Sequence, residues 1–415
     1  MQAPSATSAA RLRSRAVATY FVAAALTSIA YIGTFTVASL AAPEISGYAG
    51  SSGWPSATAI GGTALAATLL SAVMARRDRR AGIVLGIGVA AVGGVLAVVA
   101  VVVSSLPLLL VASAGVGFGN AATNLSRYAA AELYPAAQRA GALGLVVWGS
   151  TFGAVLGPNL VAPAGSLGPS IGLAPLAAGF AMALLFLLAA LTVAVAGPRA
   201  PSPPGGDSSS QAGVARVPAR RLLADLIATP RGRMAITALI SGQVVMTLIM
   251  TMTPYHLHEH SHGLVTVGFV ISAHAFGMFA FSPLSGRLTD RFGAHTMVTI
   301  GFVVLALAGI LAAGMPATGG SALAIPLFLL GIGWNLNFVA GSALLASEAT
   351  VGSGTRLQGA SDSVIWTASA LASASSGFVV AVSSYAALAI IGAGLAVLLA
   401  VALALDSRSS RGVPA

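Results

Sequence analysis

The stretch RRDRRAGIVLGIGVAAVGGVLAVVAVVV, residues 76–103, decides the fold class, because a short charged segment leads directly into an uncharged apolar run. An α-helix needs roughly 20 such residues to cross the hydrocarbon core of a bilayer. Similar runs recur along the whole chain, and 57% of the 415 residues are hydrophobic while 7% are charged. The sequence therefore predicts an all-α, multi-pass membrane protein.

Twelve segments of this kind can be placed between turn residues and charges. They are 16–40, 56–75, 82–103, 107–129, 140–163, 171–196, 233–255, 264–285, 294–314, 321–346, 358–382 and 384–405. The segment 197–232 is rich in proline, serine and arginine, which indicates a polar linker. We therefore expect two six-helix bundles, 1–196 and 233–415. The end of the linker, from Arg220 to Arg233, mixes arginines with leucines and is expected to form a short amphipathic helix.

The basic residues are all arginines, 20 in number, and they fall at the two termini and in every second gap between spans. Arg127 and Arg139 are assigned to the fourth gap on this pattern. Short loops that carry Lys or Arg remain in the cytoplasm, so both termini and the linker are expected to be cytoplasmic. The net charge of +10 then fits anionic lipid headgroups as the partner, and not nucleic acid.

Composition sets further limits. A chain without cysteine forms no disulfide and no thiolate metal site. No small-residue cleavage site follows a short apolar core at the amino terminus, so the first span is expected to be retained. Abundant alanine and arginine without lysine indicate a GC-rich bacterium. We expect a monomer without a cofactor in a bacterial plasma membrane.

An internal repeat relates the two halves. The segment GVGF at 115–118 matches GIGW at 331–334 with an offset of 216 residues, and the same offset carries Glu132 onto Glu348. A constant offset that also carries a glutamate favours common ancestry of two structural repeats over the chance recurrence of small packing residues.

The loop GRLTDRFG, residues 286–293, lies between the eighth and ninth spans. Its glycines allow helix ends to approach closely, and its Asp and Arg can cap neighbouring helix termini. With the two repeats, this loop resembles the cytoplasmic signature of the major facilitator superfamily. The resemblance implies a substrate cavity near the midplane that opens alternately to each side. It also implies a cytoplasmic gate, for which the candidates are Gly286, Asp290, Arg291 and Gly293. The alternative is a polar turn that only satisfies topology.

The corresponding loop of the first half departs from this signature. Ala75 and Asp78 stand where the aspartate and the second glycine are expected. A replacement acid is Asp362, about one turn inside the eleventh span, which we expect to meet Arg76 or Arg80 across the gate. As an intramembrane acid, Asp362 is also a candidate for proton coupling. The alternative is that it stabilises the amino terminus of its own helix.

The fifth span carries Gly144, Gly153, Gly157 and Pro158. Their spacing resembles the antiporter signature of drug exporters in the superfamily, although the trailing glycine pair is replaced by Val161 and Ala162. The resemblance favours export. Ordinary close packing of helices through small residues is the alternative. Exporters also commonly place a proton-coupled arginine in the fourth span, and the run 108–114 before Gly115 has no charge.

Four histidines alternate in the external loop after the seventh span: His256, His258, His260 and His262. In an extended segment, alternate residues point to one side and can bind Zn, Cu, Ni or Co. The same cluster can sense external pH, because histidine titrates near neutrality. The remaining interpretation is a solvated loop that is rich in histidine.

His274 lies about ten residues into the eighth span, near the midplane, and is the second candidate for proton coupling. A packing histidine that bridges two helices is the alternative. In the superfamily, spans 1, 4, 7 and 10 line the cavity. Polar residues of spans 4, 7 and 10 are therefore the cavity candidates: Asn120, Asn124, Gln243, Trp334, Asn335 and Asn337.

These cavity candidates include no lysine or arginine, so no clamp for a strong anion is visible. The leading hypothesis is a secondary transporter that moves a small organic, partly apolar molecule by alternating access, outward in exchange for protons. The alternative is a divalent-metal transporter that uses the histidines. An enzyme is disfavoured because no metalloprotease, nucleotide-binding or nucleophile motif is present. A membrane sensor that does not transport is disfavoured by the two intact repeats.

Overall fold

The computed structural model describes residues 6–48, 51, 54–135, 138–198, 218–262, 264–315, 320–348 and 354–409, and over these ranges it contains helices and no strand. Twelve of its helical segments are long and apolar enough to cross a membrane, which confirms the all-α fold class. The helices of the first half are α1 (Ala6–Ser46), α2 (Trp54–Arg76), α3 (Arg79–Val102), α4 (Leu106–Ala131), α5 (Arg139–Leu167) and α6 (Pro175–Ala196).

The second half begins with a short amphipathic helix, α8 (Ala219–Ala228), on which Leu222 and Leu226 are buried. This helix confirms the expectation for the end of the linker, although α9 already begins at Pro230. The helices that follow are α9 (Pro230–Glu259), α10 (Leu264–Phe279), α11 (Ser282–Phe292), α12 (Ala294–Gly314), α13 (Ala324–Glu348), α14 (Gly354–Val382) and α15 (Tyr385–Ser409).

The eighth span is interrupted, which the sequence did not predict. It consists of α10 and α11, separated at Ala280 and Phe281. The side chain of Asn335 on α13 holds this interruption: its amide nitrogen donates to the carbonyl of Met278 at 2.6 Å and to the Ser282 hydroxyl at 2.6 Å. Backbone groups freed by a broken membrane helix need such partners, because lipid offers none.

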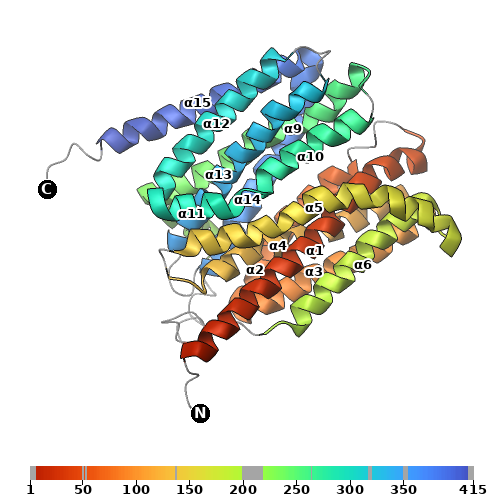
Figure 1. Cartoon of the computed structure of the whole chain (residues 1–415), viewed down its shortest axis with the longest axis horizontal. Helices are drawn as coiled ribbons and strands as arrows, with labels where there is room; N and C mark the ends of the chain where they lie inside the picture. Colours follow the sequence, from red (N-terminus) through yellow and green to blue (C-terminus); the bar gives the residue numbers. More distant parts are fainter. Residues whose placement is uncertain are drawn as a thin grey trace.

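The two halves lie side by side, with α1–α6 in red to yellow-green and α9–α15 in green to blue (Figure 1). They are joined where α2 packs against α14 and where α5 packs against α10 and α11. Glycines allow these approaches. A Cβ atom added to Gly144 would collide with the carbonyl of Ser282, and one added to Gly286 would lie 2.5 Å from the carbonyl of Ala140.

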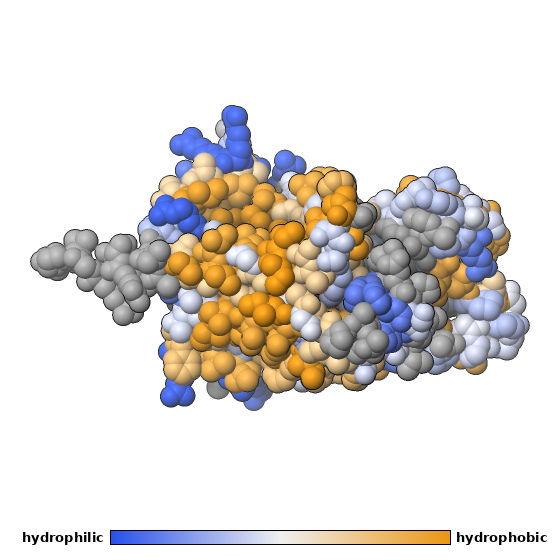
Figure 2. All heavy atoms as spheres, turned by 90° about the horizontal axis from the view of Figure 1, so that it is seen from above, coloured by the Kyte–Doolittle hydropathy of each residue, from blue (hydrophilic) through white to orange (hydrophobic). Residues whose placement is uncertain are grey.

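We call the end of the bundle that carries Arg76, Arg139 and Arg287 the arginine-rich end. The opposite end carries the α1–α2 and α3–α4 connections. Between the ends, many large apolar side chains point outward, among them Leu185 at 67% exposure and Leu398 at 70%. Figure 2 shows a broad area of apolar side chains on one face of the molecule. This surface suits contact with lipid tails.

Candidate functional site

A buried ion pair joins the two halves near the arginine-rich end. The guanidinium Nη2 of Arg127 on α4 lies 2.8 Å from Oδ1 of Asp362 on α14. Each residue is 1% exposed. The other carboxylate oxygen of Asp362, Oδ2, has no hydrogen-bond partner among the described residues. A buried carboxylate attracts its basic partner strongly only while it is ionised, so the strength of this contact depends on the protonation state of Asp362.

The same guanidinium has several further partners. Nη1 of Arg127 donates to the carbonyl of Asn124 at 2.7 Å, Nε donates to the Ser342 hydroxyl at 3.2 Å, and Nη2 donates to the Tyr128 hydroxyl at 2.8 Å. Tyr128 also places its hydroxyl 3.4 Å from Oδ1 of Asp362. The pair is therefore the centre of a network that includes groups from α4, α13 and α14.

This network corrects two expectations. Arg127 is a buried residue inside α4 and not a loop residue, and Asp362 pairs with it and not with Arg76 or Arg80. Arg76 ends α2 and is exposed, whereas Arg80 donates to the carbonyl of Ala194 in its own half at 3.1 Å. The error has a physical cause: Arg127 lies in the last turn of the predicted span 107–129, and α4 continues past it to Ala131, so this arginine is a helical residue that contacts the second half. The fourth span thus holds a charge, although not in the run 108–114.

A second polar contact between the halves involves Arg79, at the start of α3. Its guanidinium forms an ion pair with Glu132, and Nη2 donates to Oε1 of Gln358 on α14 at 2.7 Å. Asp78, which replaces the signature glycine, caps α3 by accepting from the Ala81 amide at 2.6 Å. The altered first-half loop thus contacts the second half through Arg79, a residue outside our predicted gate.

Asp290 forms the third contact between the halves. Its two carboxylate oxygens accept from the backbone amides of Ala140 at 3.3 Å and Gly141 at 2.9 Å, in the first turn of α5. A carboxylate at a helix amino terminus satisfies free amides and interacts favourably with the helix dipole. Gly293 has φ +85°, which explains a glycine there, and Arg291 lies 5.3 Å from the Phe292 ring.

The predicted cavity residues of the second half fall into two groups. Gln243 and Trp334 meet in the second half: the indole Nε1 donates to Oε1 of Gln243 at 2.8 Å, and Nε2 of Gln243 donates to the Ser369 hydroxyl at 3.1 Å. By contrast, Asn335 holds the α10–α11 interruption. Asn337 is fully buried, and its side chain packs against Gly242 of α9 and Gly301 of α12. Both asparagines serve contacts between helices of the second half in this structure.

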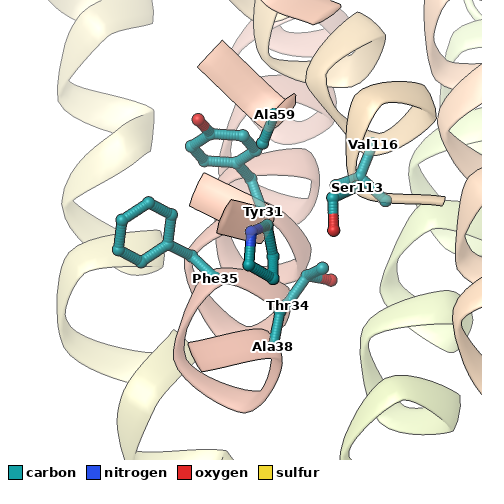
Figure 3. Close-up of a pocket in the computed structure, with 8 residues that line it drawn as sticks. Tyr31, Thr34, Phe35, Ala38, Ala59, Ser113 and Val116 are labelled. Carbon is teal, nitrogen blue, oxygen red and sulfur yellow. The ribbon is translucent and has the colours of Figure 1, made fainter. Parts of the chain in front are cut away.

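In the first half, Asn124 contacts the charge pair, and Asn120 donates to the Thr63 hydroxyl at 3.4 Å. Nearby, a small pocket lies between α1, α2 and α4 (Figure 3). Its Thr34 is 4% exposed, and the hydroxyl has no partner among the described residues. Because all of its lining residues belong to these three helices, this pocket lies within the first half. Its lining residues are Tyr31, Thr34, Phe35, Ala38, Pro55, Ala59, Ser113 and Val116.

His274 is buried at 2% exposure, and its Nδ1 lies 2.9 Å from the carbonyl of Leu327 on α13. Its Nε2 has no partner among the described residues. This contact bridges two helices of the same half. It agrees with the packing alternative, while the proton-coupling role stays a prediction.

The histidine-rich segment is not extended, which corrects the basis of the metal hypothesis. α9 continues to Glu259, so His256 and His260 lie one helical turn apart, with ring centroids separated by 4.5 Å. The His256 ring stacks on Tyr385 at 4.4 Å. Among the described residues, no three His, Asp or Glu side chains gather as a metal site. The side chain of His258 lies outside the described set.

The glycines of the fifth span pack α5 against α1. Cβ atoms added to Gly149, Gly153 and Gly157 would meet backbone or side-chain atoms of α1, whereas Gly144 faces Ser282 of the second half. Close packing is therefore their observed role, and the antiporter interpretation stays a prediction. The side chain of Pro158 lies outside the described set.

Comparison with known proteins places the chain in a family. The model of the Major Facilitator Superfamily matches residues 20–265 and 234–415. The chain is 36% identical over 374 residues to the uncharacterized MFS-type transporter YddS of Bacillus subtilis (strain 168), covering 88% of this chain and 84% of that protein. It is 27% identical over 314 residues to the riboflavin transporter RfnT of Brucella anthropi, covering 75% of each. The solved structure of the human organic anion transporter MFSD10 matches with a TM-score of 0.72 at 16% identity, over 94% of this chain and 99% of that one. The chain is a multi-pass membrane protein and belongs to the major facilitator superfamily of transporters.

Proposed function

We propose that this transporter exports a small organic, partly apolar molecule in exchange for protons, and that Asp362 carries the coupling proton. The observation that supports this role is the buried Arg127–Asp362 pair, because it bonds one half of the molecule to the other. His274, the other candidate, contacts a helix of its own half. When a group that bridges the two halves gains or loses a proton, the contact between the halves changes directly. A group that contacts only its own half has no such direct effect.

The arginine-rich end is cytoplasmic in this proposal, following the positive-inside rule. That end is closed in the structure by the contacts of Arg127, Arg79 and Asp290 with the opposite half. Protonation of Asp362 removes the ionic attraction to Arg127, which weakens closure and favours the inward-open state. Release of the proton into the cytoplasm restores the charge, and the pair can form again. A proton can thus drive one half of the cycle without substrate, as exchange requires.

An organic substrate is supported by the polar contacts that the second half offers. Gln243 and Trp334 supply an amide and an aromatic ring whose hydrogen bonds involve no lysine or arginine, which suits an uncharged or weakly charged molecule. The relative named as a riboflavin transporter agrees with an organic substrate of this kind.

The test is a flux assay in proteoliposomes with an imposed pH gradient, screening riboflavin, cationic dyes and divalent metals in one format. We expect an organic compound to move against the direction of proton flow. Movement with the protons would contradict exchange. Transport of Zn, Ni or Co that is lost on joint replacement of the loop histidines by Gln would contradict the organic substrate class. The histidines replaced are His256, His258, His260 and His262.

A further inference from the structure

The Arg127 guanidinium touches two aromatic rings. Its central carbon lies 4.3 Å from the ring centroid of Tyr128, the next residue on α4, and 4.3 Å from the ring centroid of Phe338 on α13. Phe338 belongs to the other half, so this contact crosses the same interface as the ion pair. A guanidinium within about 6 Å of a ring centroid is attracted by the negative face of the ring.

Phe338 is itself held in place by the side chains behind it. Its ring stacks on Trp334, one turn earlier on α13, with centroids 4.3 Å apart and an interplanar angle of 18°. The rings of Trp334 and Phe279 of α10 pack in a T-shaped arrangement with centroids 5.8 Å apart, and the Trp334 indole donates to Gln243 of α9. Phe338 is 5% exposed. Three helices of the second half therefore fix the ring that Arg127 contacts.

The cross-half contacts of Arg127 respond differently to a proton. The attraction to Asp362 requires a carboxylate, whereas the hydrogen bond to the Ser342 hydroxyl and the attraction to the Phe338 ring do not. Arginine stays charged in proteins, so the guanidinium remains buried and charged when Asp362 is protonated. It then needs another favourable neighbour in the interface, and the ring of Phe338 provides one.

We propose that Phe338 is a positioning residue for proton coupling: its ring holds the Arg127 guanidinium in place for Asp362, and Trp334 supports that ring. The inference rests on the proposed role of Asp362 and adds to it. In the closed state the ring keeps the Arg127 guanidinium beside Asp362 whether or not Asp362 carries a proton.

The test compares the pH profile of transport in proteoliposomes for Phe338→Leu and Phe338→Tyr. Leucine fills the space without an aromatic face, so Arg127 stabilises the Asp362 carboxylate less well. We expect the proton concentration that gives half-maximal transport to fall by a factor of about 3 to 10. Tyrosine retains the face and should keep the wild-type profile. Phe302→Leu, in the buried core of α12, is the matched control and should leave the midpoint unchanged while lowering stability.

An unchanged midpoint in Phe338→Leu, with a rate reduced equally at every pH, would mean that Phe338 only fills space. A midpoint shifted equally in Phe338→Tyr would also overturn the inference, because the aromatic face would then not matter. Both outcomes can be distinguished from failure of the proposed function. If the proposed function were wrong, the neutral variant of the pair, Arg127→Gln with Asp362→Asn, would keep the wild-type pH dependence of transport.

Discussion

Replacing Asp290 by alanine should open the arginine-rich end. In the structure its carboxylate accepts two backbone amides of α5 across the halves, at 3.3 and 2.9 Å. Removing a capping side chain typically costs about 0.5–2 kcal/mol. Asp290 is exposed, so solvent screening places the expected loss near the middle of that range, at about 1 kcal/mol. Because about 1.4 kcal/mol corresponds to a tenfold ratio, the closed-to-open ratio should fall roughly fivefold.

The measurement is a distance distribution between spin labels on the two halves. The chain contains no cysteine, so thiols introduced at Arg77 and Arg287 would be labelled selectively. Both positions are exposed, at the end of α2 and on α11, and neither side chain takes part in the contacts described above. Asp290→Ala should enlarge the long-distance population, and Asp290→Asn should enlarge it less, because the amide oxygen can still accept one bond.

The matched control is Asp225→Ala, which removes an exposed carboxylate from α8 and should leave the distribution unchanged. If Asp290→Ala gave the wild-type distribution in the same preparation, the capping contact would not hold this end closed, and the reasoning would be refuted.

Three further predictions concern topology, packing and polar contacts. A cytoplasmic reporter fused after Arg80 should be active, whereas one inserted at Ser51 should behave as external; the reverse would overturn the orientation. Gly286→Val should reduce transport by more than about tenfold without loss of insertion, because a Cβ there meets backbone of α5, while Gly88→Val should have no effect because nothing lies within 4 Å. Gln243→Leu should lower the free energy of unfolding by about 1 kcal/mol in thermal melts, since the Trp334 indole loses its acceptor; an unchanged melting temperature would argue against that hydrogen bond.

Much of the fold could be predicted because hydrophobicity and arginine placement are local properties. The predicted ninth span, 294–314, equals α12, and the amphipathic end of the linker is α8. The interruption of the eighth span has one local signal, Pro283 in the first turn of α11, because proline removes an amide donor and clashes with the preceding turn. The side chain that satisfies the groups at the interruption, Asn335, lies more than fifty residues away and could not be identified from the sequence.

The site was predicted less well, because charge alone does not reveal a partner. Asp290 was identified from its loop, and the structure gives it the capping contact that the motif suggested. Asp362 was also identified, but Arg127 was assigned to a loop because the pattern of alternate gaps gave it a topological role. One signal was available: Arg127 lies inside the predicted fourth span, 107–129, and α4 continues past it to Ala131.

The histidine segment shows a second limit. Alternation at every second residue predicts one face only if the backbone is extended, and the same residues in a helix point in different directions. Here the helix of the seventh span continues through His256 to Glu259. Continuation of a membrane helix beyond the bilayer is set by tertiary contacts, such as the stacking of His256 on Tyr385.

The central claim is that the Arg127–Asp362 pair couples protons to transport. Breaking one partner leaves a buried charge, which costs about 3–5 kcal/mol, so the informative variant is the neutral pair Arg127→Gln with Asp362→Asn. In proteoliposomes we expect this variant to exchange labelled for unlabelled substrate, and to show no accumulation of substrate when a pH gradient is imposed. Proton-driven accumulation at the wild-type rate in the neutral variant would contradict the account.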